Sequence, residues 1–121
     1  MTPGLKRKSV LLVEDDLEIV MTLGRRLKRK GHEVTVAHSV SEAIDFLEKS
    51  DFDFIVSDLR LKGPSHGEEL FRFVQTMGKE APRLILMSGY PNDLQEMSDK
   101  YKPFQKLQKP FLVKELLNLL Q

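Results

Sequence analysis

The sequence predicts one α/β domain built on a parallel β-sheet that helices cover on both faces. Short apolar segments alternate five times with segments whose apolar residues recur at helical spacing. This alternation is typical of strands that are joined by helical crossovers and therefore run parallel. The best-defined strand, Val10–Val13, is an unbroken apolar run rich in branched residues, which suits burial on both faces of a sheet. We therefore expect a doubly wound fold with five strands and five helices.

The composition agrees with a single globular domain. The chain has 121 residues, of which 40% are hydrophobic and 31% charged, and its net charge is +1. This balance is too apolar for a disordered chain, and the length suffices for a core without disulfides or a structural metal. The near-neutral charge argues against direct nucleic-acid binding, and the apolar runs are too short to span a membrane. The absence of cysteine excludes a disulfide framework and suits the cytoplasm.

Five segments have the composition of strands, because branched and apolar residues recur in each of them. In chain order, the predicted strands are Val10–Val13, His32–Ala37, Phe54–Val56, Leu84–Met87 and Phe104–Gln108. The chain begins with a basic stretch that contains Pro3 and Gly4, which discourage regular structure. We therefore expect residues 1–8 to be a lead-in and residues 9–121 to be the domain.

Capping residues and apolar stripes mark the five helices. Asp16 is placed to cap the first helix, and the capping box Ser39–Glu42 begins the second. Asn92 or Asp93 is expected to cap a short fourth helix. The stripes that define the helices are Val20, Leu23 and Leu27, then Val40, Ala43, Ile44 and Leu47, then Leu70, Val74 and Met77, then Leu94 and Met97, and finally Val113, Leu116, Leu117 and Leu120.

Polar side chains suited to chemistry come directly after the strands. Because the carboxyl ends of parallel strands meet at one edge of a sheet, we expect these side chains to share that edge. They are Glu14, Asp15 and Asp16 after the first strand, Asp58 at the end of the third, Ser88 after the fourth and Lys109 after the fifth. Of the three acids after the first strand, Asp16 is better explained as a helix cap than as a metal ligand.

This combination of side chains predicts a phosphoryl-transfer site. If the first and third strands are neighbours, their carboxylates meet in a small space, and the mutual repulsion requires a cation. Oxygen ligands with few protein anchors favour Mg²⁺. Lys109 adds a positive charge and Ser88 a hydroxyl donor. A carboxylate nucleophile, a hard metal, an ammonium group and a hydroxyl together suit phosphoryl transfer.

Four motifs resemble those of response-regulator receiver domains from two-component signalling. They are VLLVEDD from Val10, DFIVSDLRL from Asp53, LMSG from Leu86 and KPF from Lys109. The motifs follow the family's order and spacing over residues 9–121. The resemblance implies a flavodoxin-like doubly wound sheet with the strand order 2-1-3-4-5.

The resemblance also implies a function for the acidic residues. Asp58 would accept a phosphoryl group from a histidine kinase or a phosphotransfer domain. Mg²⁺ would be held by Glu14, Asp15 and Asp58, helped by the backbone carbonyl of Arg60. Such a domain is a phosphoacceptor switch rather than an enzyme, although it catalyses its own phosphorylation and loses the phosphoryl group slowly.

Further residues take roles from the same resemblance. Ser88 and Lys109 would bind the phosphoryl oxygens, and the bond from Lys109 to Pro110 would be cis. Arg60 and Tyr90 lie two residues beyond the phosphoacceptor and the serine, at positions that flank the path of the attacking water in this family. We hypothesise that these bulky side chains slow hydrolysis of the aspartyl phosphate.

The expected partner is a protein. The phrases MSGY from Met87 and LQKPF from Leu107 further resemble receivers fused to hybrid sensor histidine kinases. A basic run, Arg25–Lys30, ends the first predicted helix, where cations complement the helix dipole. In the family this helix is a docking site for a kinase or phosphotransfer domain, which is a better functional explanation than nucleic acid. We expect no membrane contact by this domain, and the sequence leaves a homodimer open.

Two positions depart from the family pattern and support an alternative function. Lys62 stands where proline is usual, in a loop to Gly67 that is one residue longer than usual, and Lys106 occupies the position of the aromatic switch residue. The alternative is a receiver-like interaction module that is not phosphorylated. A metal-dependent hydrolase or nuclease is disfavoured. Arg60 stands where a haloacid-dehalogenase-type phosphatase needs a second acid. A Toprim-type site would pair Glu14 with an Asp-x-Asp motif at the end of a strand, whereas Asp51 and Asp53 precede their strand.

Overall fold

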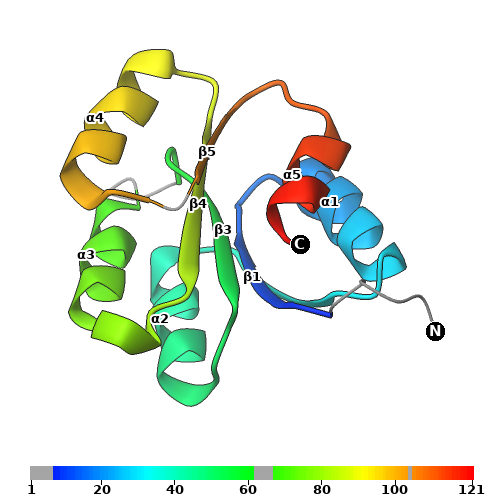
Figure 1. Cartoon of the computed structure of the whole chain (residues 1–121), viewed down its shortest axis with the longest axis horizontal. Coiled ribbons are helices and arrows are strands. Elements are labelled where there is room, and N and C mark those ends of the chain that lie inside the picture. Colours follow the sequence, from blue (N-terminus) through cyan, green and yellow to red (C-terminus); the bar gives the residue numbers. More distant parts are fainter. Residues whose placement is uncertain (1–6, 62–66, 104) are drawn as a thin grey trace.

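The computed structural model describes residues 7–61, 67–103 and 105–121, which form the predicted doubly wound α/β fold. Among these residues, five parallel strands form one sheet in the order β2-β1-β3-β4-β5 (Figure 1). In chain order, the elements are β1 (Ser9–Val13), α1 (Leu17–Arg29), β2 (Glu33–Ala37), α2 (Val40–Lys49), β3 (Phe54–Asp58), α3 (Glu68–Thr76), the 3₁₀ turn η1 (Gly78–Glu80), β4 (Arg83–Ser88), α4 (Pro91–Tyr101), β5 (Gln105–Gln108) and α5 (Val113–Leu119).

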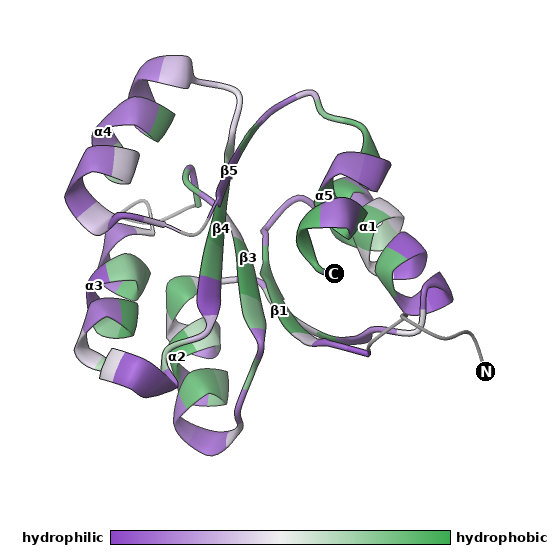
Figure 2. Ribbon diagram, viewed as in Figure 1, coloured by the Kyte–Doolittle hydropathy of each residue, from purple (hydrophilic) through white to green (hydrophobic). Residues whose placement is uncertain are grey.

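Helices bury the sheet from both sides. The α1 and α5 helices pack on one face, and α2, α3 and α4 pack on the other (Figure 1). Successive strand residues point to opposite faces, so Val10 and Leu12 of β1 pack with α1 and α5. Leu11 and Val13 pack on the opposite face, and all four side chains are 0% exposed. Two-sided burial therefore explains the unbroken apolar run of β1, and Figure 2 shows β1 and β3 mainly in the hydrophobic colour.

The polar composition of β5 reflects its place at the edge of the sheet. The prediction of a strand at Phe104–Gln108 is confirmed over Gln105–Gln108, whereas Phe104 lies outside the described residues. Within β5, the side chain of Leu107 is buried against the core and the other three residues are exposed. An edge strand has a neighbouring strand on one side alone, so it tolerates polar side chains that a central strand cannot bury.

Two of the predicted helix caps are confirmed. The carboxylate of Asp16 accepts hydrogen bonds from the backbone nitrogens of Glu18 and Ile19 at 2.9 and 3.3 Å, and α1 follows. The Ser39 hydroxyl accepts from the backbone nitrogen of Glu42 at 3.1 Å, so it satisfies a donor in the first turn of α2. The longest described helix, α1, has 13 residues, and no described helix is long and apolar enough to cross a membrane.

The predicted cap of the fourth helix is wrong. The α4 helix begins at Pro91, with Tyr90 at the capping position, so Asn92 and Asp93 lie inside the first turn. Proline favours the first helical position because its fixed φ suits a helix and its missing N–H is not needed there. Asp93 still favours the helix, because an acidic side chain in the first turn complements the helix dipole.

The partly buried His32 joins the lead-in to the loop between α1 and β2. Its Nδ1 atom accepts a hydrogen bond from the backbone nitrogen of Lys8 at 3.1 Å. Burial of the ring lowers the pKa of His32, and the charge of Lys8 lowers it further. The folded chain therefore favours the neutral imidazole, which can accept at Nδ1.

This contact predicts a pH-dependent stability. Because the unfolded chain binds a proton on His32 at a higher pH than the folded chain, the stability present at neutral pH is lost as the pH falls. The free energy of unfolding of the wild type should fall more than that of His32→Gln between about pH 7.5 and pH 5. Urea denaturation at a series of pH values measures this difference. The matched control is His38→Gln at an exposed histidine, and equal effects of both substitutions would contradict the assignment.

Candidate functional site

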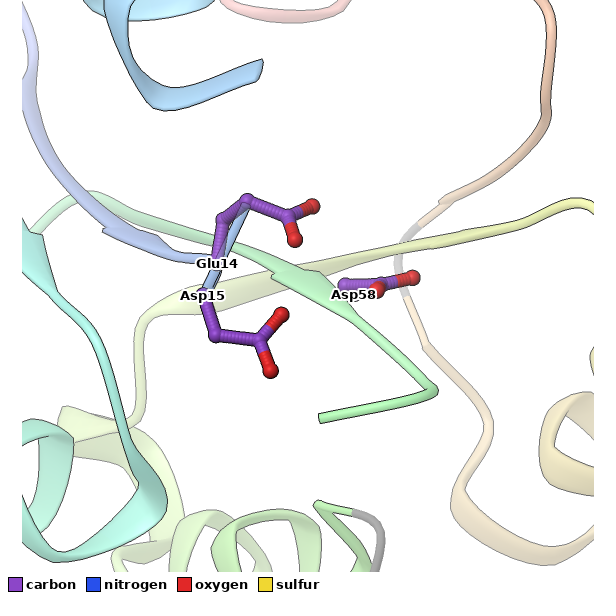
Figure 3. A group of neighbouring side chains, drawn as sticks. All are labelled: Glu14, Asp15 and Asp58. Carbon is purple, nitrogen blue, oxygen red and sulfur yellow. The ribbon is translucent and has the colours of Figure 1, made fainter. Parts of the chain in front are cut away.

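Three carboxylates meet where β1 and β3 end. Glu14 and Asp15 directly follow β1, and Asp58 is the last residue of β3, whose Ser57 pairs with Val13 of β1. Glu14, Asp15 and Asp58 each contribute a carboxylate oxygen that lies within 4.8 Å of the other two (Figure 3). Strand order explains the meeting, because β1 lies between β2 and β3.

These carboxylates are buried to different degrees. Glu14 is 1% exposed and Asp58 is 7% exposed, whereas Asp15 is intermediate. Figure 3 shows the carboxylates of Glu14 and Asp15 extending toward the side on which Asp58 lies. The donor set contains oxygen alone and no histidine or cysteine, so it suits a hard divalent cation rather than zinc.

The ammonium group of Lys109 pairs with two of the three acids. Its Nζ atom lies 3.3 Å from Oε2 of Glu14 and 3.4 Å from Oδ1 of Asp58. The backbone nitrogen of Lys109 also donates to the carbonyl of Ser88 at 2.8 Å, which joins the end of β5 to the end of β4. The following bond to Pro110 is cis, as the resemblance implied. The ammonium group therefore lies where the sequence predicts a positive charge.

The hydroxyl of Ser88 is buried at the end of β4, with 1% of the residue exposed. Met87, the residue before it, pairs with Asp58 in the sheet, so the serine follows directly beyond the phosphoacceptor candidate. The Oγ atom accepts a hydrogen bond from the backbone nitrogen of Tyr90 at 3.0 Å. Accepting this bond leaves the hydroxyl hydrogen able to donate to a ligand.

Burial makes the ionised form of Glu14 costly. Desolvation raises the pKa of Glu14, and the neighbouring charge of Asp58 raises it further. The backbone nitrogen of Asp16 donates to Oε1 of Glu14 at 3.1 Å, and this bond and Lys109 lower the pKa, although burial dominates. A cation bound among the three carboxylates would offset the repulsion between Glu14 and Asp58.

A second polar cluster links Arg60, two residues beyond Asp58, to the start of α4. The guanidinium carbon of Arg60 lies 4.0 Å from the centre of the Tyr90 ring, and Nε donates to Oδ2 of Asp93 at 2.8 Å. We call these three residues the Arg60–Tyr90–Asp93 cluster. The bond to Asp93 raises the pKa of Arg60, and Asp58 contributes a smaller effect in the same direction.

Sequence reasoning singled out Arg60 and Tyr90 but did not assign Asp93 a role in the site. The signal available was an acidic residue near the start of a helix, which is common and indicates no partner. Its partner lies 33 positions earlier in the chain, where no spacing rule applies. Tyr90 is 53% exposed and Lys106 is exposed on β5, whereas Lys62 and the loop around it lie outside the described residues.

The raised pKa of Glu14 predicts that, in the absence of divalent cations, the folded chain becomes more stable when the Glu14 carboxylate loses its charge. The folded chain keeps the Glu14 proton to a higher pH than the unfolded chain. The stability therefore falls as the pH rises from the unfolded pKa to the folded pKa of Glu14, and it stays lower at neutral pH. Glu14→Gln should therefore raise the free energy of unfolding on the order of 1 kcal/mol, a typical single-residue effect. Urea denaturation near neutral pH with EDTA measures it. Glu96→Gln, at an exposed position of α4, is the control, and a less stable Glu14→Gln would contradict the prediction.

Comparison with known proteins identifies a family. The family model described as the response regulator receiver domain matches residues 10–121. Among curated proteins, the transcriptional regulatory protein GlrR of Escherichia coli is 35% identical over 81 residues, which are 67% of this chain and 18% of GlrR. The chain thus spans less than a fifth of the length of that relative.

Solved structures agree in fold. The chemotaxis response regulator CheY4 of Vibrio cholerae is 27% identical with a TM-score of 0.82, over 96% of this chain and 98% of CheY4. A response regulator from Burkholderia pseudomallei, whose structure contains a phosphorylated aspartic acid, a calcium ion and citrate, is 27% identical with a TM-score of 0.78, over 94% of this chain and 66% of that chain. With its family motifs, its strand order and a family match over residues 10–121, this chain belongs to the response regulator receiver domains.

Proposed function

We propose that Asp58 accepts a phosphoryl group from a histidine kinase or a phosphotransfer domain in a Mg²⁺-dependent reaction. The observation that carries this proposal is the meeting of Glu14, Asp15 and Asp58 at the ends of β1 and β3, with the Lys109 ammonium group beside Glu14 and Asp58. Three carboxylates this close together can share one hard divalent cation, and the ammonium group can contact an oxygen of a transferred group. Such a set suits a site that is completed by a metal ion and by phosphoryl oxygens.

In the proposed reaction, an oxygen of the Asp58 carboxylate attacks the phosphorus of the donor. A new oxygen–phosphorus bond forms, the bond from phosphorus to the leaving nitrogen or oxygen of the donor breaks, and the leaving group takes the electron pair. Glu14, Asp15, Asp58 and the backbone carbonyl of Arg60 would hold Mg²⁺, which supplies positive charge to the phosphoryl oxygens when bound. The role of the Arg60 carbonyl as a metal ligand is a prediction from the family resemblance.

Two side chains would stabilise the transferred group. Lys109 already contacts Oδ1 of Asp58 at 3.4 Å, so its ammonium group would neutralise an oxygen of a phosphoryl group on this carboxylate. Ser88 can donate its hydroxyl hydrogen. Because its Oγ also accepts from the backbone nitrogen of Tyr90, a change at the hydroxyl reaches the turn before α4 directly. We propose that this turn carries the phosphorylation signal to partner proteins.

The surface beside the site suits a protein partner. Leu17 and Met21 of α1 are 66% and 59% exposed, and Leu112, before α5, is 62% exposed. An apolar groove runs between α1 and the segment after β5, and its lining includes Ile19, Leu23, Pro110, Phe111 and Val113. We propose that a kinase or phosphotransfer domain docks there, in the cytoplasm, with this chain acting alone or as the receiver of a hybrid histidine kinase. A measurement of molecular size in solution would test whether the chain also forms a homodimer.

Intact mass after incubation with acetyl phosphate and Mg²⁺ tests the phosphorylation. The wild type should gain the mass of one phosphoryl group, because Asp58 is the nucleophile and the cation neutralises the transferred oxygens. Asp58→Asn should gain none, and excess EDTA should abolish the gain in the wild type. The matched control is Asp45→Asn at an exposed position of α2, which should be phosphorylated like the wild type.

The result separates the proposed function from its alternative. A folded wild type that gains no mass and shows no stabilisation by Mg²⁺ would favour the interaction module that is not phosphorylated. A gain that persists in Asp58→Asn would show that another residue is the acceptor.

We also propose that Arg60 and Tyr90 slow hydrolysis of the phosphorylated form. The stacked side chains of Arg60 and Tyr90 are exposed, whereas Asp58 and Ser88, each two residues earlier in the chain, are buried. The stacked guanidinium group and ring would together present a broad surface that obstructs the approach of water.

This proposal predicts the lifetime of the aspartyl phosphate. The double substitution Arg60→Ala/Tyr90→Ala should accelerate dephosphorylation about tenfold, which corresponds to about 1.4 kcal/mol in the barrier. The decay of the phosphorylated mass after removal of acetyl phosphate measures the rate. The control Arg72→Ala removes an exposed arginine of α3 and should leave the rate unchanged. An unchanged rate in the double variant would sink the idea.

A further inference from the structure

The Arg60 side chain is held on two sides although half of it is exposed. Its guanidinium group stacks on Tyr90 at 4.0 Å, and its Nε atom donates to Asp93 at 2.8 Å. The side chain of Arg60 is 49% exposed and that of Asp93 is 32% exposed. A cation–π contact at an exposed position is weak by itself, so stacking alone does not hold a long, flexible side chain in one place.

Asp93 and Tyr90, in contrast, have fixed backbones. Asp93 lies in the first turn of α4, next to Leu94, which is 5% exposed and packs in the core. The backbone nitrogen of Leu94 donates to the carbonyl of Tyr90 at 3.2 Å, and the backbone nitrogen of Tyr90 donates to Ser88. Both partners of Arg60 are therefore positioned by the same short segment, which begins at the site and ends in the core.

We propose that Asp93 is a positioning residue that holds the Arg60 guanidinium on the Tyr90 ring and thereby lengthens the lifetime of phosphorylated Asp58. The charge-assisted bond fixes the direction of the guanidinium group, and the ring supplies the flat surface on which it lies. Asp93 acts on the reaction through Arg60 and does not touch the reacting atoms. This inference rests on the proposed function, in which Asp58 is phosphorylated and Arg60 and Tyr90 obstruct water.

A competing anion explains why the arginine needs a tether. Arg60 follows Asp58 by two residues and carries the opposite charge. A phosphoryl group on Asp58 would strengthen the attraction between them and draw an untethered guanidinium group away from the ring. With Asp93 in place, the stacked arrangement retains a partner of opposite charge, so it persists while the phosphoryl group is present.

The reaction that the cluster would slow is hydrolysis. A water oxygen forms a bond to phosphorus, and the bond from phosphorus to the Asp58 carboxyl oxygen breaks. The electron pair returns to the carboxylate, inorganic phosphate leaves, and the proton lost by water passes to phosphate or solvent. No further reactant is needed, so the rate depends on how easily water reaches the phosphorus atom.

A double-mutant cycle on the full chain tests the proposal. After phosphorylation with acetyl phosphate and Mg²⁺ and removal of the donor, Asp93→Ala should lose the phosphoryl group about two- to fivefold faster than the wild type, which is the range expected for an exposed charge pair. In the Arg60→Ala background, Asp93→Ala should have no further effect, because the residue that it positions is absent. Asp99→Ala removes the same charge from an exposed position of α4 and should match the wild type.

Each other outcome overturns the proposal. Equal acceleration by Asp93→Ala with and without Arg60 would mean that Asp93 acts through the helix rather than through the arginine. An unchanged rate in Asp93→Ala, with normal phosphorylation, would overturn this inference and leave the proposed function intact. A wild type that takes up no phosphoryl group would overturn the proposed function and the inference with it.

A spectroscopic measurement checks the positioning itself. The ring current of Tyr90 should shift the side-chain proton signals of Arg60 upfield in the unphosphorylated wild type, because the guanidinium group lies over the ring. Asp93→Ala should move these signals toward the values of an exposed arginine, and Tyr90→Ala should do the same. Unchanged shifts in Asp93→Ala would contradict the tether, even in a variant whose fold is intact.

Discussion

Glu14 and Asp58 are carboxylates that the fold buries almost completely, and the Lys109 ammonium group lies 3.3 and 3.4 Å from them. A buried charge is costly unless it is paired, so the two carboxylates depend on the cation beside them. The three groups come from the ends of β1, β3 and β5, so each of these strands must keep its place in the sheet. The helices that pack on both faces of the sheet keep these strands in order, and the site depends on that order.

The same constraint explains why the site is built at the ends of rigid strands. Apart from the partly buried Ser9, β1 and β3 are buried inside the sheet, and their apolar residues pack alternately on the two helical layers. This packing stabilises the fold, which lets the strand ends hold several carboxylates close together. The raised pKa of Glu14 is the visible consequence, since the folded chain holds that carboxylate in a less favourable environment than the unfolded chain does.

The Arg60–Tyr90–Asp93 cluster differs from the group of Glu14, Asp58 and Lys109 in its exposure to solvent. Its members are partly exposed, so each contact is weakened by solvent, and the arrangement depends on several contacts acting together. The buried carboxylates and Lys109 therefore form a more constrained group than this cluster, whose contacts are between partly exposed side chains.

Local patterns in the sequence determined most of the fold. The alternation of strands and helices, the cap at Asp16 and the box at Ser39 are interactions within a few residues, which the order of side chains reveals directly. The positions of the acids, Ser88 and Lys109 after their strands were equally local. The predicted cap of α4 was wrong, because Pro91 begins the helix before the two good capping residues, Asn92 and Asp93.

Tertiary structure alone decided how those residues meet. The distances from Lys109, the burial that raises the pKa of Glu14 and the partial burial of His32 depend on which elements pack together. The bond between Arg60 and Asp93 joins residues 33 positions apart, and no local pattern marks either as the other's partner. Periodicity and caps follow from forces along the chain, whereas pairing, burial and charge environment follow from contacts across the folded structure, which the order of residues does not display.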